Sequence, residues 1–133
     1  GKFNVDATDG SPVIEDHDEE SDCTNCEAGK SSAASSTSCS VCVAGKYRTT
    51  ATIGQACANC PQGSFLSDAG TNAAAHILAS QCETCLIGQY TASAGQASCT
   101  LCPVGKFNNN AATAASAHTS CTFCPNGKIV NAE

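Results

Sequence analysis

Large hydrophobic side chains are scarce along this chain and nowhere form a long run. Leu, Ile, Val and Phe together supply 19 of 133 residues, and Trp and Met are absent. The apolar content of 41% comes mostly from 22 Ala and 12 Cys. A chain with so few large apolar residues does not normally assemble a self-sufficient core. The pattern therefore predicts short strands and turns held together by something other than hydrophobic burial.

The cysteine content supplies that other means. Twelve cysteines in 133 residues match the density of a disulfide scaffold, and an even count allows all of them to pair. Closing a loop of about 15 residues stabilises a fold by roughly 3 kcal/mol in the chain-entropy model. Six such bridges would offset the missing core. The composition thus predicts a small disulfide-rich, elongated fold in a secreted, extracellular or cell-surface protein.

The cysteines follow one repeated motif. Each belongs to a Cys-x-x-Cys pair, and a glycine always stands three residues after the second cysteine. Such a glycine indicates a tight turn that needs positive φ, or a close approach of two backbones. The cysteines are Cys23, Cys26, Cys39, Cys42, Cys57, Cys60, Cys82, Cys85, Cys99, Cys102, Cys121 and Cys124, and the glycines are Gly29, Gly45, Gly63, Gly88, Gly105 and Gly127.

Aromatic residues complete the motif. Four of the six repeats place an aromatic two residues after the turn glycine, and these are four of the six aromatics in the chain. We expect each ring to stack on the neighbouring disulfide and give its repeat a minimal core. The four residues are Tyr47, Phe65, Tyr90 and Phe107.

The whole pattern, Cys-x-x-Cys-Pro-x-Gly-x-aromatic and then a polar stretch, resembles the ephrin-receptor-like cysteine-rich repeats. It is also similar to the modules of tumour-necrosis-factor-receptor ectodomains. The resemblance covers residues 23–128, and Gly1-Lys2-Phe3 fits the same frame. It implies an elongated tandem array of short two-stranded β modules and turns, with little helix and no enzymatic activity. The partial motif at residue 1 predicts that the chain is a segment of a longer array.

Two disulfide connectivities fit the spacing. The resemblance favours a receptor-like scheme that closes all twelve cysteines within adjacent pairs. In the alternative, the second cysteine of each pair joins the first of the next, as in Cys42–Cys57, which leaves Cys23 and Cys124 for cysteines outside the segment. The receptor-like pairs are Cys23–Cys39, Cys26–Cys42, Cys57–Cys82, Cys60–Cys85, Cys99–Cys121 and Cys102–Cys124.

The repeats divide the chain into segments. We predict an acidic linker at 1–22 that continues a truncated upstream repeat, then repeats 1–2 at 23–56, repeats 3–4 at 57–98 and repeats 5–6 at 99–133. Two long intervals carry Ala-rich inserts, each with room for one short helical turn. Thr71 or Asn72 would cap the first turn, and Asn110 the second.

The charge distribution limits the partners. Twelve acidic residues against six Lys and Arg argue against nucleic acid, and no apolar stretch is long enough for membrane insertion within this segment. Residues 6–22 hold eight of the acids, which suit either a solvated linker, the favoured interpretation, or a weak calcium site. The calcium candidates are Asp6, Asp9, Glu15, Asp16 and Asp18.

Ser and Thr make up 28 residues, and no Asn-x-Ser/Thr sequon is present. Their clusters are candidates for O-linked glycans, because mucin-like stalks share this bias, although small polar residues also simply fill disulfide loops. The candidates are Ser31, Ser32, Ser35, Ser36, Thr37, Thr49 and Thr50.

Together these features favour a non-enzymatic extracellular structural protein, a rod segment that self-associates into a filament or a surface coat. Its partners would be other copies of itself or neighbouring array segments, and we expect no cofactor. A receptor or adhesion ectodomain that binds a protein or glycan is the first alternative, but the chain has only one Arg. A protein with several four-cysteine zinc sites is the second. His17, His76 and His118 share no metal-ligand spacing.

Overall fold

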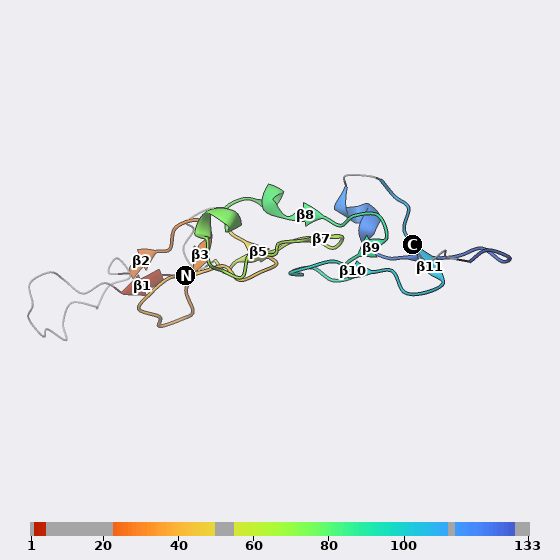
Figure 1. The fold of residues 1–133 in the computed structure, drawn as a ribbon. Helices are drawn as coiled ribbons and strands as arrows, with labels where there is room; N and C mark the ends of the chain where they lie inside the picture. The colour runs from red at the N-terminus through yellow and green to blue at the C-terminus, as the bar shows by residue number, and fades with distance from the viewer. Residues whose placement is uncertain (1, 5–22, 50–54, 112–113, 130–133) are drawn as a thin grey trace, which may run out of the picture.

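The protein is an elongated row of small repeats. The computed structural model describes residues 2–4, 23–49, 55–111 and 114–129. In these ranges the repeats follow one another along one long axis, from β1 and β2 at one end to β11 at the other (Figure 1). Each repeat is numbered by its turn glycine, from Gly29 in repeat 1 to Gly127 in repeat 6.

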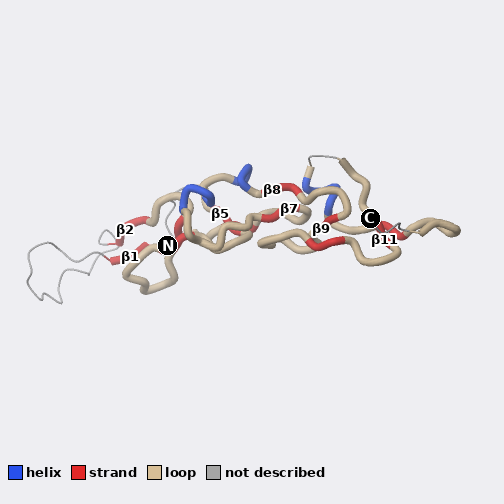
Figure 2. The backbone as a smooth tube through the Cα atoms, in the orientation of Figure 1, coloured by secondary structure: helices blue, strands red, loops and turns tan. Residues whose placement is uncertain are grey.

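Six two-stranded antiparallel sheets form the row, and loops connect them (Figure 2). The predicted fold class is confirmed by these sheets. The paired strands are β1 (Lys2–Asn4) with β2 (Cys23–Asn25), β3 (Lys30–Ser31) with β4 (Ser40–Val41), β5 (Lys46–Tyr47) with β6 (Ala58–Asn59), β7 (Ser64–Phe65) with β8 (Glu83–Thr84), β9 (Gln89–Tyr90) with β10 (Thr100–Leu101), and β11 (Lys106–Phe107) with β12 (Thr122–Phe123).

One turn geometry precedes the five sheets from β3–β4 to β11–β12. In repeat 2 the Lys46 amide donates to the Val43 carbonyl over 3.1 Å, and Gly45 between them has φ +75°. Positive φ at the third residue of a hydrogen-bonded turn defines a type II turn, which glycine adopts without steric cost. All six turn glycines have positive φ.

The register that follows the turn is the same in all six sheets. The residue after the glycine always faces the residue before the second cysteine of the next pair, as Lys46 faces Asn59. Lys2 faces Asn25 in this way too, so β1 and β2 repeat the pattern of the other five sheets. Lys2 and Phe3 therefore pair with β2 in the register that their predicted place in the repeat motif requires.

The disulfides follow the alternative connectivity, and the favoured receptor-like pairing is wrong. The turn reverses the chain directly after Cys26, which places its Cα 5.6 Å from that of Cys39. The same local geometry recurs in each repeat, so the second cysteine of a pair always meets the first of the next. The five bonds are Cys26–Cys39, Cys42–Cys57, Cys60–Cys82, Cys85–Cys99 and Cys102–Cys121.

Two of these bonds cross the inner boundaries of the predicted segments. Cys42–Cys57 spans the boundary at residue 56, and Cys85–Cys99 spans the one at residue 98. The division into segments itself stays a prediction. The bonds show that consecutive repeats are covalently joined without a break from Cys26 to Cys121.

Neighbouring repeats also share backbone hydrogen bonds. The Gly45 amide of repeat 2 donates to the Leu66 carbonyl of repeat 3 over 2.8 Å, and Gly63 donates in the same way to Thr91 of repeat 4 over 3.1 Å. Equivalent bonds join Gly29 to Arg48 and Gly88 to Asn108. In each case the acceptor stands three residues after the next turn glycine. The stacking of repeats is therefore made by backbone groups of the turn glycine and of the next repeat.

A second contact reaches two repeats along the chain. A Cβ on Gly29 would overlap the carbonyl oxygen of Ala73 in the loop of repeat 3, and one on Gly63 would overlap that of Ala115 in the loop of repeat 5. A Cβ on Gly45 would overlap Gly95 in the loop of repeat 4. The first three turn glycines are thus buried under the loops of later repeats.

Three short 3₁₀ helices lie in the described parts of the long loops. Asn72 caps the first, and its side-chain oxygen accepts from the Ala74 amide over 3.1 Å, which confirms that prediction. Asn110 does not cap the third, whose N-cap is Ala114, because the turn begins four residues later than expected. The helices are η2 (Ala73–His76), η3 (Ala79–Gln81) and η4 (Ala115–His118).

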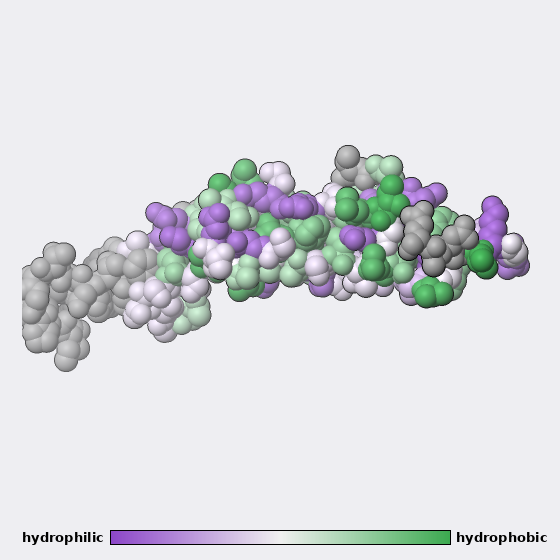
Figure 3. Space-filling model, viewed as in Figure 1, coloured by the Kyte–Doolittle hydropathy of each residue, from purple (hydrophilic) through white to green (hydrophobic). Residues whose placement is uncertain are grey.

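Very little apolar side chain is buried. Among the described residues, the buried hydrophobic positions are Leu66 and the four cysteines Cys26, Cys42, Cys60 and Cys85. No helix in the described ranges is both long and apolar enough to cross a membrane. Hydrophobic residues gather at the surface of one half of the rod, near β9 to β11 (Figure 3). The described body thus depends on disulfides and backbone hydrogen bonds, as its composition predicts.

Mutation can separate two effects of a side chain at a turn glycine, namely the strain of positive φ and the overlap with a later loop. Gly63→Ala and Gly105→Ala both place a Cβ at positive φ, +78° and +81°, which costs about 1–2 kcal/mol. Only Gly63→Ala also drives a Cβ into the loop above it, since no described residue lies within 4 Å of a Cβ on Gly105. We expect Gly63→Ala to lower the free energy of unfolding by at least about 1 kcal/mol more than Gly105→Ala. Denaturant unfolding with intact disulfides measures this difference, and equal losses would contradict the contact.

The connectivity can be read by non-reducing peptide mapping after free thiols have been blocked. We expect linked peptides that contain Cys42–Cys57 and Cys85–Cys99, because only the continuous scheme makes these bonds. A reduced digest of the same protein is the control. Recovery of a Cys57–Cys82 peptide would show that the receptor-like scheme holds instead.

Candidate functional site

A buried histidine fixes the long loop of repeat 3 to repeat 2. His76 ends η2 and is fully buried. Its Nδ1 lies 2.6 Å from the Lys46 carbonyl oxygen, and its Nε2 lies 2.9 Å from Asp68 Oδ1. Both ring nitrogens thus have an oxygen partner, one from repeat 2 and one from repeat 3. The ring therefore links the Lys46 backbone to the Asp68 carboxylate.

Asp68 is held by more than the histidine. Its Oδ1 accepts from the amides of Gly70 and Thr71, each over 3.0 Å, and its Oδ2 accepts from the Thr71 hydroxyl over 2.9 Å. The His76 hydrogen bond, then those from Thr71 and the Asn72 amide, lower the pKa of the carboxyl well below its ordinary value, and burial opposes them only weakly. Asp68 therefore stays ionised at neutral pH.

Repeat 5 has a related arrangement in which a side-chain amide, not a carboxylate, lies beside the ring. His118 ends η4, is 1% exposed, and lies with its Nδ1 3.3 Å from Asn108 Nδ2. The backbones also correspond, because the His76 carbonyl accepts from the Arg48 amide and the His118 carbonyl from the Thr91 amide. Both histidines stand 13 residues after their turn glycines. This shared position could have been found in the sequence, but a search for metal-ligand spacing misses it.

These side chains tie repeats to one another. Within the described ranges no group of three or more His, Cys, Asp or Glu residues could hold a metal ion. The four-cysteine zinc hypothesis is wrong, because ten of the twelve cysteines form disulfides and cannot supply thiolates. The calcium candidates lie outside the described residues.

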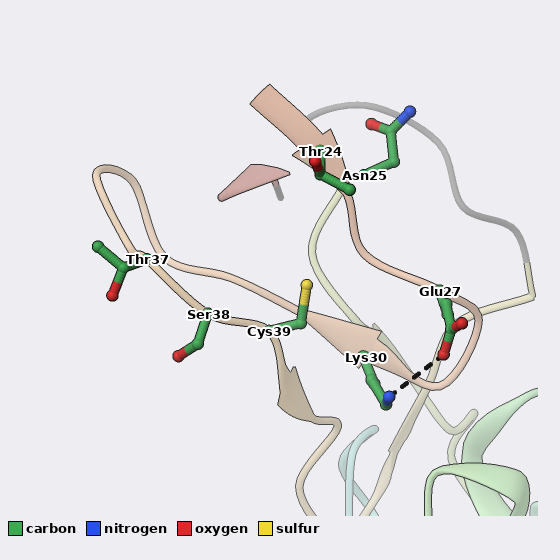
Figure 4. A pocket seen from close by; sticks show the side chains of 7 residues that line it. All are labelled: Thr24, Asn25, Glu27, Lys30, Thr37, Ser38 and Cys39. Carbon is green, nitrogen blue, oxygen red and sulfur yellow. Dashed lines mark hydrogen bonds and ion pairs between the residues drawn. The ribbon is translucent and has the colours of Figure 1, made fainter. Parts of the chain in front are cut away.

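A groove lined mainly by polar side chains lies near the β2 end of the rod. It has a volume of about 390 Å³ and opens between β2 and the loop that follows β3 (Figure 4). Its lining contains one ion pair, between Lys30 Nζ and Glu27 Oε2 at 3.2 Å. The Glu27 side chain is 83% exposed, and ion pairs this exposed contribute little to stability. Its lining consists of Thr24, Asn25, Glu27, Lys30, Thr37, Ser38 and Cys39.

The remaining predicted positions are spread along the rod. The four aromatics occupy the second residue of β5, β7, β9 and β11 and are half-buried, while their stacking on disulfides stays a prediction. Glycosylation also stays a prediction. Ser35, Thr37 and Thr49 are exposed, Ser31, Ser32 and Ser36 are half-buried, and Thr50 lies outside the described residues.

The Asp68 carboxylate makes a testable contribution to acid stability. Because its pKa in the folded state lies below its ordinary value of 3.8, the unfolded chain binds the proton more tightly. The stabilisation is therefore present above about pH 4 and is lost as the pH falls toward the folded-state pKa. We expect Asp68→Asn to flatten the decline of the thermal midpoint below pH 4. Glu27→Gln, which removes an exposed carboxylate, is the control, and identical acid profiles for the two variants would refute the assignment.

Comparison with known proteins gives one match. Residues 70–117 match the family described as tyrosine-protein kinase ephrin type A/B receptor-like. No curated protein and no solved structure matches the chain. The matched segment contains β8 to β11 and the Cys85–Cys99 disulfide, whose register and bonding recur in the other repeats. The chain thus carries an ephrin-receptor-like cysteine-rich module, of the extracellular receptor type, within a longer row of repeats that share its turn, register and disulfide pattern.

Proposed function

We propose that the chain is a non-enzymatic structural segment of an extracellular protein, a disulfide-linked rod that associates with further copies into a filament or a cell-surface coat. Five disulfides and a module of the extracellular receptor type support the location outside the reducing cytosol. The module's receptor type also supports a role without catalysis.

The observation that carries the proposal is the repetition of one backbone contact along the rod. The turn glycine of each of the first four repeats donates to the carbonyl of the next repeat, in the same geometry each time. The hydrogen bond uses backbone groups, so it has the same form in each of these four repeats. The repeats are therefore stacked in the same way and expose similar surfaces along the rod. Repetitive faces of this kind favour head-to-tail or lateral association.

A receptor or adhesion ectodomain is the alternative. The polar groove around Lys30 and the receptor-like family description are compatible with it. Binding hot spots, however, are rich in exposed Arg and large aromatic residues. The single Arg of this chain, Arg48, is 3% exposed and donates to the Lys30 carbonyl, so it serves the contact between repeats. This use of Arg48 supports the structural role.

Sedimentation velocity over a concentration series tests the proposal on the full chain, produced in an oxidising compartment. We expect elongated species larger than the monomer that grow with concentration, and rods longer than one chain in negative-stain images. The same protein, reduced and alkylated, is the control and should lose these species, because the repeats depend on their disulfides. A single monomeric boundary at every concentration would refute self-association.

A further inference from the structure

The two long loops are anchored by histidines with different partners, a carboxylate in repeat 3 and an amide in repeat 5. We propose that the second contact is acid-sensitive, so that protonation of the His118 ring releases the loop of repeat 5 from the turn of repeat 3. The loop of repeat 3, anchored by His76, stays docked under the same conditions. This inference is independent of the proposed self-association.

The hydrogen bonds of Asn108 fix the direction of its contact with the ring. Its Oδ1 accepts from the Asn110 amide over 3.0 Å, and its Nδ2 lies 3.3 Å from the Gln89 carbonyl oxygen and 3.4 Å from that of Ala117. A flipped side chain would place its oxygen against two carbonyls and its NH₂ against an amide hydrogen. Nδ2 is therefore the donor, and His118 Nδ1, 3.3 Å away, is the acceptor.

The ring can accept this hydrogen bond only through a lone pair on Nδ1. A proton on that nitrogen would point at the NH₂ group of Asn108, which can only donate. His118 is also 1% exposed, so water cannot solvate an added charge on the ring. A buried charge is costly unless an opposite charge pairs with it. The docked loop therefore favours the ring with no proton on Nδ1.

The charged residues of the described chain do not offer the ring a counterion. Three of them are carboxylates. Asp68 and Glu27 belong to other ion pairs, and Glu83 of β8 is exposed and lines a groove beside Asp68. The other titratable residues of the strands near the ring are Lys106 of β11, which is itself a cation, and Tyr90 of β9, a phenol that supplies no charge at acid pH.

His76 has the opposite surroundings. Its Nδ1 faces the Lys46 carbonyl and its Nε2 faces the Asp68 carboxylate, so a proton on either nitrogen meets an acceptor. Arg48, the other charged residue that contacts it, does so through its backbone amide. The pKa of the Asp68 carboxyl lies well below its ordinary range, chiefly because of the His76 hydrogen bond, and the carboxylate persists at about pH 5. Acid therefore leaves this anchor in place.

Release of the repeat 5 loop would uncover the turn of repeat 3. The docked loop places the Ala115 carbonyl where a Cβ on Gly63 would lie. The His118 carbonyl accepts from the Thr91 amide, and the Thr91 carbonyl accepts from the Gly63 amide over 3.1 Å. These contacts connect repeats 3, 4 and 5. Acid would therefore loosen the rod at this position, while the disulfides keep the chain continuous.

Hydrogen exchange at single amides, followed by NMR on the full oxidised chain, tests the proposal. The Thr91 amide donates to the His118 carbonyl over 3.0 Å and reports on the loop of repeat 5. The Arg48 amide donates to the His76 carbonyl over 2.7 Å and is the matched control. Protection factors correct each rate for the intrinsic pH dependence of exchange. From about pH 7.5 to about pH 5, we expect the protection of Thr91 to fall about tenfold and that of Arg48 not to fall.

Two further measurements separate this effect from a general loss of structure. His118→Gln removes the titrating ring, and the protection of Thr91 should then be equal at the two pH values. Ring ¹⁵N shifts of the wild-type chain at about pH 7.5 should place the His118 proton on Nε2. Unchanged protection of wild-type Thr91, equal losses at Thr91 and Arg48, a loss that persists in His118→Gln, or a proton on Nδ1 would each overturn the proposal.

Discussion

The interaction on which this structure depends is the close backbone contact at each turn glycine. In repeat 2, Gly45 takes a φ that other residues avoid, donates its amide to repeat 3, and lies under the Gly95 carbonyl of repeat 4. A side chain at this position would disturb the turn and the contact above it. Because only Leu66 and four cysteines are buried apolar residues in the described ranges, little hydrophobic packing could compensate for its loss.

The disulfides and the stacked turns extend along the rod in the same way. Each bond joins the second cysteine of one pair to the first of the next, so the covalent linkage, like the hydrogen bonding, passes from each repeat to its neighbour. The receptor-like scheme would close the cysteines in separate blocks and leave the joints between blocks to noncovalent contacts. The continuous scheme instead limits the freedom of the unfolded chain at every joint.

The sequence predicts the parts that depend on short-range rules. The glycine turn, the short strands and the Asn72 cap each follow from a few adjacent residues. The connectivity could not be predicted in this way, because both schemes satisfy the spacing and the outcome depends on where the turn places Cys26 relative to Cys39. The predicted Asn110 cap is wrong because η4 begins at Ala115, with Ala114 as its N-cap. The burial of His76 depends on contacts with Lys46 and Asp68, 30 and 8 residues away, which local patterns do not show.

Among the repeats whose loops the structure describes, loop length explains why only two use a histidine. The disulfides of repeats 3 and 5 close the longest segments, with separations of 22 and 19 residues, against 13 to 15 in the other three. A longer loop has more conformational freedom to lose when it docks on an earlier turn. The short loop of repeat 4 contacts the earlier turn through the backbone at Gly95. The long loops of repeats 3 and 5 each have a buried histidine as well, His76 and His118, 13 residues after the turn glycine. The repeats can therefore vary in length while the stacking contact stays constant.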